Sequence, residues 1–445
     1  MPKGRKKTYK SLPKEVKNLL CTEDYQLLAR AFYCTPGGSQ ANSKRHGHVI
    51  DRTSPAYAIR GEGPYIELSN KRRLIDLAGA NGAVPLGYAD PQVECNVRSL
   101  AQEQGGSLSL PSPLEIAASE AMIKNLTDSM SGNHMITNPL VRWVRTGSEA
   151  VSAAVAIAQE ETKRIDVGCL EGSYHGWHPW TRQAKTLPAF SWFKKAKTDN
   201  VIELLRREDV AVVLIESPRF DPVDDSYKKA LAVIREACNA TKTLLAFDDV
   251  VFGFRFAEGG LTQVSKVKPD LICFAKALGN GYPIGCVVGR GALMDKHKYR
   301  VSSTFGGEMT GLAAAMAVLE KHEPHGMVGR NDYRLSDTCR TLRAIGAKLI
   351  LRLREVLEGT PIDVVGNPQH FKFVPRDSAS DSAHRDLMLF CNLCWMFSDI
   401  RRGELGVLIH KDANNANLAM NDGVIDNICE IITRASSIVS NSNYE

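Results

Sequence analysis

Lys276 is the first of three groups in the middle of the chain whose types and spacing suit covalent and acid–base chemistry. It follows the apolar run Leu271–Phe274 and precedes Gly279 and Gly281. A lysine at the end of a buried strand either extends its amine to solvent or is held near a partner, because burying an unpaired ammonium is costly. Partial burial lowers the pKa of such an amine and makes it a usable nucleophile.

A pair of carboxylates forms the second group. Asp248 and Asp249 end the apolar run Leu244–Phe247. In open α/β sheets, ligands bind beyond the carboxyl ends of the strands, so a catalytic acid would lie at this position. An Asp at a strand end also caps the following turn, and these residues alone support both interpretations equally.

The third group, Arg145–Ala150, follows the apolar run Val141–Val144 and opens an alanine-rich helix. The N-terminus of a helix leaves backbone N–H groups without partners and favours an anion. Ser148 can cap this helix or bind a phosphate, and capping without a ligand is the simpler interpretation. Taken together, however, the three groups are what pyridoxal phosphate (PLP) needs. The helix start would take the phosphate, Lys276 would take the aldehyde as an imine, and Asp248 would take the ring nitrogen.

The elements that must position these groups alternate between short apolar runs and helical stretches. The expected strands are Val141–Val144, Val210–Ile215, Leu244–Asp248, Leu271–Phe274 and Ile284–Val288, and the expected helices include Glu149–Glu160, Tyr227–Cys238 and Gly311–Glu320. This alternation predicts an α/β fold with a mostly parallel central sheet and helices on both faces.

Flanking patterns predict three regions. Residues 1–79 read as an N-terminal segment with a basic tail, one or two short helices over 11–35 and a hairpin made of Tyr65–Leu68 and Leu74–Leu77. Residues 80–325 form the large domain that carries the sheet. Residues 326–445 form a smaller α+β domain with long helices at Leu335–Leu357 and Val424–Ile438.

Composition places the chain among ordinary cytoplasmic proteins. Its 445 residues are 43% hydrophobic, with 56 Lys and Arg against 50 Asp and Glu. No apolar run approaches the roughly 20 residues of a membrane span. Its 11 cysteines are irregularly spaced, which fits reduced thiols. Basic side chains at Lys3, Arg5, Lys6, Lys7 and Lys10 form a short tail, for which simple solvation is favoured over contact with a nucleic acid.

The sequence also resembles a known family. The segments FDDVVFGFR (247–255) and KPDLICFAKALGNGYPIGCVVGR (268–290) resemble the signature of class III, or ω-type, aminotransferases of fold type I, in the branch of glutamate-1-semialdehyde 2,1-aminomutases. Supporting matches are PGGSQANSKR (36–45), RGEGPYIELSNKRRLIDLAGANGAVPLGYADP (60–91), SLPSPLE (109–115), YHGWH (174–178) and STFGGE (303–308).

This resemblance implies roles for individual residues. Lys276 would form the imine with PLP, Asp248 would contact the pyridinium nitrogen, and Gly147 and Ser148 would hold the phosphate. Tyr174 would lie over the ring face with His175 beside it, and Glu216 would lie near the cofactor. Thr304 would reach the phosphate of the neighbouring subunit, which implies a homodimer with shared active sites. Ser43, Lys44 and Arg45 would line the substrate pocket, where a cation could hold a carboxylate, and Arg255 belongs to the motif in a catalytic or a structural role.

The leading functional hypothesis is an aminotransferase that acts on a small amino donor and a carbonyl acceptor. An intramolecular 2,1-aminomutase of the glutamate-1-semialdehyde type uses the same residues and is the alternative. An epimerase, a decarboxylating enzyme or an enzyme acting on a nucleic-acid-linked amine ranks below both. The segment HKDANNANL (410–418), followed by Ala419-Met420-Asn421, departs from the pattern of the family near its C-terminus.

Overall fold

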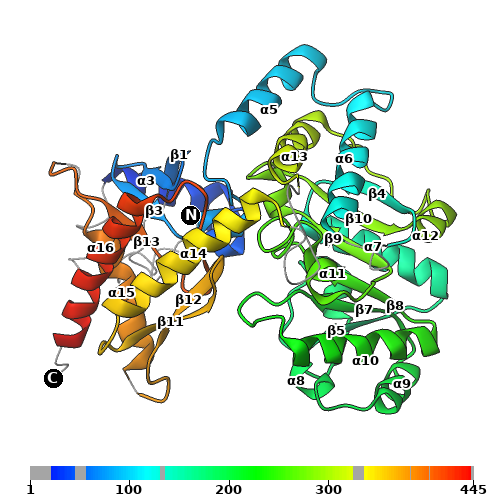
Figure 1. Cartoon of the computed structure of the whole chain (residues 1–445). Helices are drawn as coiled ribbons and strands as arrows, with labels where there is room; N and C mark the ends of the chain where they lie inside the picture. Colours follow the sequence, from blue (N-terminus) through cyan, green and yellow to red (C-terminus); the bar gives the residue numbers. More distant parts are fainter. Residues whose placement is uncertain are drawn as a thin grey trace. The chain divides into compact units, whose positions relative to one another are not determined.

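The structure is a computed structural model that describes residues 22–45, 57–130, 136–323, 335–380, 382–399 and 401–441. The described residues form two compact units (Figure 1). One unit consists of the residues up to Asn81 and from Ile345 onward, and the other consists of Gly82–Ala344. The basic tail at residues 3–10 and the first part of the helical stretch expected at 11–35 lie outside the described residues.

A seven-stranded sheet is the centre of the Gly82–Ala344 unit. Its strand order is β4-β10-β9-β8-β7-β5-β6. The strands are β4 (Pro139–Val144), β5 (Asp166–Leu170), β6 (Lys185–Leu187), β7 (Val210–Glu216), β8 (Leu244–Asp248), β9 (Leu271–Phe274) and β10 (Gly285–Arg290). β5 to β9 pair in parallel, whereas β10 is antiparallel to both β4 and β9. The mostly parallel sheet is therefore confirmed, and β10 is the strand whose direction the sequence did not indicate.

Both faces of the central strands are buried. Successive side chains of a strand point to opposite faces of the sheet, and other residues pack against each face. Alternate residues, such as Val212 and Leu214 of β7 and Leu244 and Ala246 of β8, form a core cluster with helix α7 (Gly147–Thr162). The intervening Leu245 is also fully buried, on the opposite side. This two-sided burial explains why the central strands read as continuous apolar runs in the sequence.

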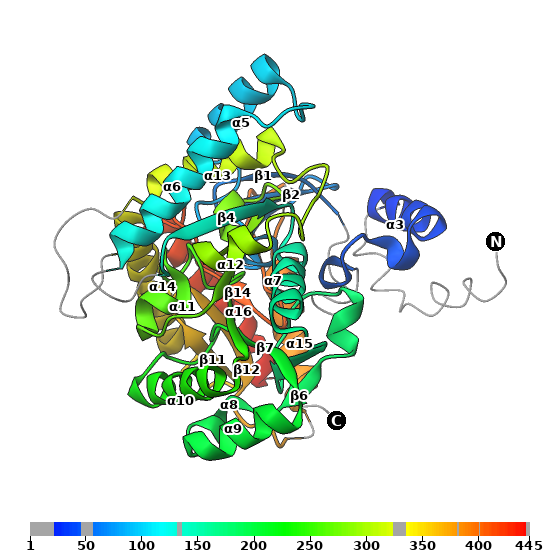
Figure 2. The ribbon, with the colours of Figure 1, turned by 90° about the vertical axis from the view of Figure 1, so that its right-hand side faces the viewer.

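The unit contains further helices besides α7 and α14 (Asp337–Val356). They are α5 (Pro91–Gln104), α6 (Pro113–Ser129), α8 (Phe190–Phe193), α9 (Thr198–Arg207), α10 (Asp225–Thr241), α11 (Gly260–Ser265), α12 (Gly291–Lys296) and α13 (Met309–Lys321), with 3₁₀ turns η4 (Pro179–Arg182) and η5 (Lys276–Gly279). α13 packs beside α5 and α6 (Figure 2) and also contacts η5. The unit boundary falls within α14.

Two small sheets form the strands of the other unit. The first has the order β1-β2-β3-β13, and the second has the order β11-β12-β14. Their strands are β1 (Ala58–Glu62), β2 (Tyr65–Leu68), β3 (Arg73–Asp76), β11 (Ile362–Asn367), β12 (His370–Pro375), β13 (Gly406–Leu408) and β14 (Asn414–Asn415). The expected hairpin is present, because β2 and β3 pair antiparallel with Tyr65 opposite Ile75.

Helices and short turns complete this unit. They are α3 (Thr22–Cys34), α4 (Gly79–Gly82), which ends at the first residue of the other unit, α15 (Ala383–Met396), α16 (Asp422–Asn441), η1 (Pro36–Gly38) and η2 (Asn42–Lys44). The long C-terminal helices expected from the sequence are α14 and α16. Across the described part of the chain, no helix is both long and apolar enough to traverse a lipid bilayer.

Candidate active site

Three ionisable side chains gather at one edge of the seven-stranded sheet. Glu216 ends β7 and lies opposite Asp248, the last residue of β8. Asp248 in turn lies opposite Cys273 of β9, and Lys276 follows Cys273 by three residues. Because β7, β8 and β9 are parallel, their carboxyl ends meet at the same edge, where α/β proteins bind ligands.

Lys276 is held in an unusual backbone conformation at this edge. Its φ is +47°, in the left-handed region that residues with a side chain rarely adopt. The side chain is partly buried, and burial lowers its pKa to about 8, an effect that Asp248 and Glu216 partly oppose. About a tenth of the amine is therefore neutral, and hence nucleophilic, at pH 7, far more than for an ordinary lysine.

His175 and Asp248 form a buried pair. Nδ1 of His175 lies 2.8 Å from Oδ2 of Asp248, and the side chains are only 2% and 5% exposed. The other carboxylate oxygen of Asp248 accepts a hydrogen bond from the backbone N–H of Val250 at 3.2 Å. His175 Nε2 is buried and has no hydrogen-bond partner among the described residues. A buried polar atom without a partner costs free energy, which makes it a mark of a ligand or catalytic position.

Tyr174 and Glu216 extend the same cluster. The backbone N–H of Tyr174 donates to Oε2 of Glu216 at 2.9 Å, and Nε of Arg219 lies 3.1 Å from Oε1. Burial raises the pKa of Glu216, with the charge of Arg219 acting in the opposite direction. The Tyr174 side chain is 61% exposed, so Tyr174 does not belong to the hydrophobic core.

The start of α7 supplies backbone donors. Oγ1 of Thr146 accepts from the Glu149 N–H at 3.1 Å, and the Glu149 carboxylate accepts from the Thr146 N–H at 3.2 Å. Thr146 is therefore the N-cap, and of the two roles open to Ser148, capping is excluded. The N–H groups of Gly147 and Ser148 have no acceptor within the helix, which leaves them available to an anion.

Gly176 lies directly against this helix start. Its φ is +93°, and a Cβ added there would lie 2.4 Å from Oγ of Ser148. A Cβ added to Gly147 would likewise lie 2.7 Å from a methyl carbon of Val250, two residues beyond Asp248. The helix start, the His175 loop and the end of β8 are thus packed so closely that only glycine fits at both contacts.

Two further residues of the DDVVFGFR motif are structural. Asp249 is fully buried, accepts hydrogen bonds from Ser217 Oγ and from the Leu261 N–H, and has its pKa raised to about 7 by burial. Arg255 is also fully buried, and its guanidinium donates to the carbonyl of Gly82 at 2.8 Å. Both side chains fix the loop that follows Asp248.

The other predicted site residues lie elsewhere. Thr304 is exposed and lines a hollow of about 190 Å³ between residues 107–112 and 303–309. Ser43 and Arg45 belong to the other unit, where Ser43 Oγ accepts from Nδ2 of Asn81 at 3.1 Å. The structure thus brings together Lys276, Asp248, His175, Tyr174 and Glu216, with Gly147 and Ser148 joined to them through Gly176.

Sequence reasoning missed two features of this cluster. It placed His175 beside a cofactor ring but did not predict its bond to Asp248, because a pairing across 73 positions leaves no local pattern. It also did not use His178, although the second histidine of YHGWH was a visible signal.

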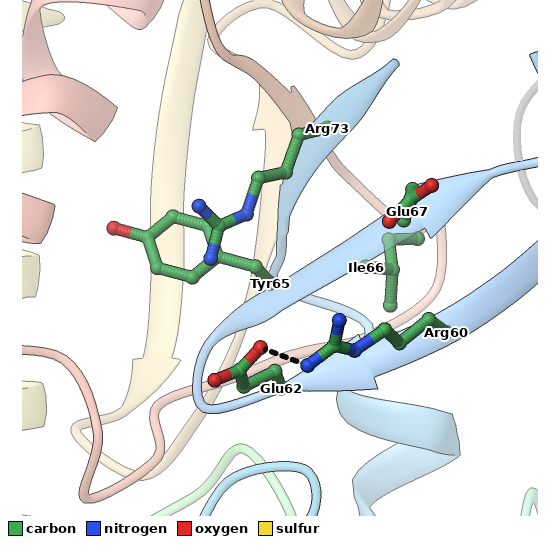
Figure 3. Close-up of a pocket in the computed structure, with 6 residues that line it drawn as sticks. All are labelled: Arg60, Glu62, Tyr65, Ile66, Glu67 and Arg73. Atoms are coloured by element: carbon green, nitrogen blue, oxygen red, sulfur yellow. Dashed lines mark hydrogen bonds and ion pairs between the residues drawn. The ribbon is translucent and has the colours of Figure 1, made fainter. Parts of the chain in front are cut away.

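A separate hollow lies on the hairpin of the other unit (Figure 3). It measures about 220 Å³ and is lined by Arg60, Glu62, Tyr65, Ile66, Glu67 and Arg73. Arg60 pairs with Glu62 at 2.8 Å, and the guanidinium of Arg73 lies 4.0 Å from the centre of the Tyr65 ring. Its lining lacks a lysine, histidine or cysteine, so this hollow offers no amine, imidazole or thiol of the kind found at Lys276 and His175.

The gathered groups fit PLP. A partly neutral amine suits an aldehyde, the carboxylate of Asp248 suits a protonated ring nitrogen, and the N–H groups at the start of α7 suit a phosphate. The orphaned Nε2 of His175 and the close approach of Gly176 to Ser148 are the marks of a space shaped for a ligand.

Similarity to known proteins points the same way. The family model described as Aminotransferase class-III matches residues 49–187 and 193–360. A 2′-deamino-2′-hydroxyneamine transaminase of Streptomyces kanamyceticus is 31% identical over 280 residues, covering 61% of this chain and 68% of the relative. A glutamate-1-semialdehyde 2,1-aminomutase of Methanothrix thermoacetophila is 30% identical over 324 residues, covering 66% and 70%.

The fold has close counterparts among solved structures. The FumI protein of Sphingopyxis sp. MTA144, solved in its PLP internal aldimine form, has a TM-score of 0.75, covers 94% of this chain and 96% of its own, and is 22% identical. At that identity the likeness establishes the fold, a mostly parallel α/β sheet of fold type I.

Proposed function

Because the chain belongs to the class III aminotransferase family and is a PLP-dependent transaminase or aminomutase, we propose that it is an aminotransferase. It moves an amino group from a small amino donor to a small carbonyl acceptor. The observation that carries this proposal is the partly buried Lys276 amine, with its pKa of about 8, beside the buried His175–Asp248 pair.

Each residue of the cluster has a proposed role. When bound, PLP supplies an electron sink for a carbanion at the substrate Cα. Asp248 keeps the ring nitrogen protonated, and His175 orients the Asp248 carboxylate. Gly147 and Ser148 hold the phosphate at the start of α7, Tyr174 covers the ring face, and Glu216 fixes the Tyr174 backbone.

Lys276 has two tasks in this proposal. It holds the cofactor through its amine nitrogen, and it moves a proton between the substrate Cα and carbon C4′ of the cofactor. A positioned general base contributes about 10²–10⁴-fold to a rate. The lowered pKa suits this task, because the amine must be neutral to accept the proton and must release it again within one turnover.

For the substrate we propose that Ser43 and Arg45 line the pocket. The Asn81 amide holds the Ser43 hydroxyl at 3.1 Å, which fixes the segment that Arg45 follows. A guanidinium is the side chain best suited to bind a carboxylate. This supports a substrate that carries a carboxylate.

We further propose a homodimer in which Thr304 reaches the phosphate of the partner subunit. Exposed apolar side chains beside the Thr304 hollow support an interface there, because Leu108 and Leu110 are 56% and 78% exposed and Phe305 is 50% exposed. Every cysteine of the described residues is a free thiol, which supports a cytoplasmic location.

An intramolecular 2,1-aminomutase is the second candidate, supported by the name of the Methanothrix thermoacetophila relative. The same residues would serve, but the amino group would return to the molecule that supplied it. The two functions therefore differ in whether a second substrate is consumed.

The test follows the transfer of an amino group from a donor to the holoenzyme. Incubation with one amino donor and no acceptor should convert the donor to its keto acid in an amount equal to the enzyme, and Lys276→Ala should abolish this conversion. Conversion of an amino aldehyde to its isomer without a second substrate would instead indicate the mutase. A purified protein that neither carries nor takes up PLP would refute both functions.

A further inference from the structure

The loop that carries Tyr174 and His175 is held by a series of polar contacts. Between residues 171 and 180 only His175 is buried and Trp177 is 75% exposed, whereas Trp180 is partly buried against the core cluster that contains α7. Tyr174 is held by Glu216, His175 by Asp248, and Gly176 packs on Ser148. Two hydrogen bonds made by residues after Gly176, His178 and Trp180, involve one and the same partner atom.

That atom is Oγ of Ser152, in the second turn of α7. It lies 2.6 Å from Nδ1 of His178 and 2.8 Å from Nε1 of Trp180. An indole N–H can only donate, so Ser152 accepts from Trp180. The Ser152 hydroxyl keeps its hydrogen and a second lone pair, so its bond with His178 Nδ1 can run in either direction, according to the tautomer of His178.

Ser148 and Ser152 are four residues apart and therefore lie on the same face of α7. The loop runs along this face, with Gly176 against Ser148 and with His178 and Trp180 against Ser152. The helix that offers its start to the phosphate is thus joined at two levels to the loop that carries His175.

We propose that Ser152 and His178 are positioning residues for PLP, a proposal that rests on the proposed function. Neither residue touches the cofactor. They hold the loop so that His175 stays bonded to Asp248 and Gly176 stays against the phosphate-binding turn. Loosening this anchor would weaken PLP retention and disturb the ionisation of the bound cofactor, while the sheet and its core stay intact.

The test compares Ser152→Ala, which removes both bonds, with His178→Asn, whose amide can still bond to the Ser152 hydroxyl as donor or as acceptor. Thr162→Ala is the matched control, because Thr162 lies at the end of the same helix and its hydroxyl makes only local bonds, donating to the Ala158 carbonyl and accepting from the Arg164 N–H. Three quantities are measured for each variant. They are the PLP dissociation constant, the pH midpoint of the visible absorption band, and hydrogen exchange of the peptide covering residues 174–182 in the apoenzyme.

Loss of a bridging hydroxyl with two bonds should weaken PLP binding about tenfold, which corresponds to about 1.4 kcal/mol. For Ser152→Ala we expect this loss, a shifted pH midpoint and faster exchange over residues 174–182. His178→Asn should stay within about threefold of the wild type, and Thr162→Ala should match it. Ser152→Ala that lowers the melting temperature but leaves PLP binding and the pH midpoint at the Thr162→Ala values would overturn the proposal. Failure of the wild type to bind PLP would instead refute the proposed function.

Discussion

Nδ1 of His175 lies 2.8 Å from Oδ2 of Asp248, with both side chains withdrawn from water. In a dry environment a charge-assisted hydrogen bond fixes the direction of a carboxylate strongly. The pair therefore presents the end of β8 as an oriented negative group, and its other carboxylate oxygen is held by the Val250 N–H.

This pair predicts the effect of removing the charge while keeping the shape. In Asp248→Asn the amide oxygen can still accept from His175, but no negative group faces the ring nitrogen of PLP. We expect kcat/KM to fall by at least about 10²-fold, with the folded structure retained. Asp225→Asn, a change at a side chain that is 92% exposed on α10, is the control and should leave kcat/KM unchanged. Equal kcat/KM values for Asp248→Asn and the wild type would exclude a role for this charge.

Lys276 predicts a pH dependence of cofactor capture. Burial disfavours the ammonium form and lowers the pKa to about 8, so the neutral amine predominates above that pH. The rate at which apoenzyme takes up PLP, followed by visible absorbance, should rise with pH up to about 8 and then level off. An ordinary lysine would keep gaining rate up to pH 10, and such a profile would contradict the lowered pKa. Borohydride reduction should fix PLP to the amine that holds it. Mass spectrometry should then find the added mass of PLP on Lys276 in the wild type, and no such addition in Lys276→Ala.

The contact between Gly176 and Ser148 predicts a difference between two glycines. Gly176→Ala places a Cβ 2.4 Å from Ser148 Oγ, at a φ of +93°. Gly172→Ala is the matched control, because its φ is +80° but no atom lies within 4 Å of the added Cβ. Both variants carry backbone strain of about 1 kcal/mol, and the contact with Ser148 should lower the melting temperature of Gly176→Ala further than that of Gly172→Ala. Only Gly176→Ala should lose PLP affinity, by about 10-fold or more, and similar affinities in the two variants would show that the close packing is irrelevant to the cofactor.

Shared active sites predict complementation between two inactive variants. Thr304→Glu puts a negative charge where the phosphate of the partner subunit is proposed to lie, and Lys276→Ala removes the amine of its own subunit. Mixing the two and refolding them together should restore activity, because one site of the mixed dimer receives wild-type residues from both chains. Lys276→Ala mixed with Asp248→Asn should stay inactive, since each site then lacks one residue of its own chain. No recovery in the first mixture would argue against sharing through Thr304.

The sequence predicted closely the elements that a local pattern of residues specifies, above all the buried central strands. Leu244–Asp248 and Leu271–Phe274 are strands with the predicted bounds, because each is an uninterrupted apolar run ended by a polar or small residue. The direction of β10 was not predictable, since a buried run looks the same in a parallel and an antiparallel pairing.

Long-range contacts explain most of what sequence reasoning missed at the site. Thr146 and Ser148 both suit a helix start, and only the observed hydrogen bond to Glu149 distinguishes them. The bond between His175 and Asp248 and the convergence of His178 and Trp180 on Ser152 join separate elements, so no periodicity records them. The roles of all the predicted site residues stay predictions, those of Lys276, Asp248 and His175 included.

The pairing of β3 with β13 has a consequence for synthesis on the ribosome. Leu74 lies opposite Gly406, so the first half of this sheet emerges from the ribosome more than 300 residues before its partner strand. Residues 82–344 include the whole seven-stranded sheet and can fold in that interval. The three strands β1, β2 and β3, in contrast, lack their partner strand until translation is nearly complete, so the edge formed by β3 stays exposed and is a site for chaperone protection.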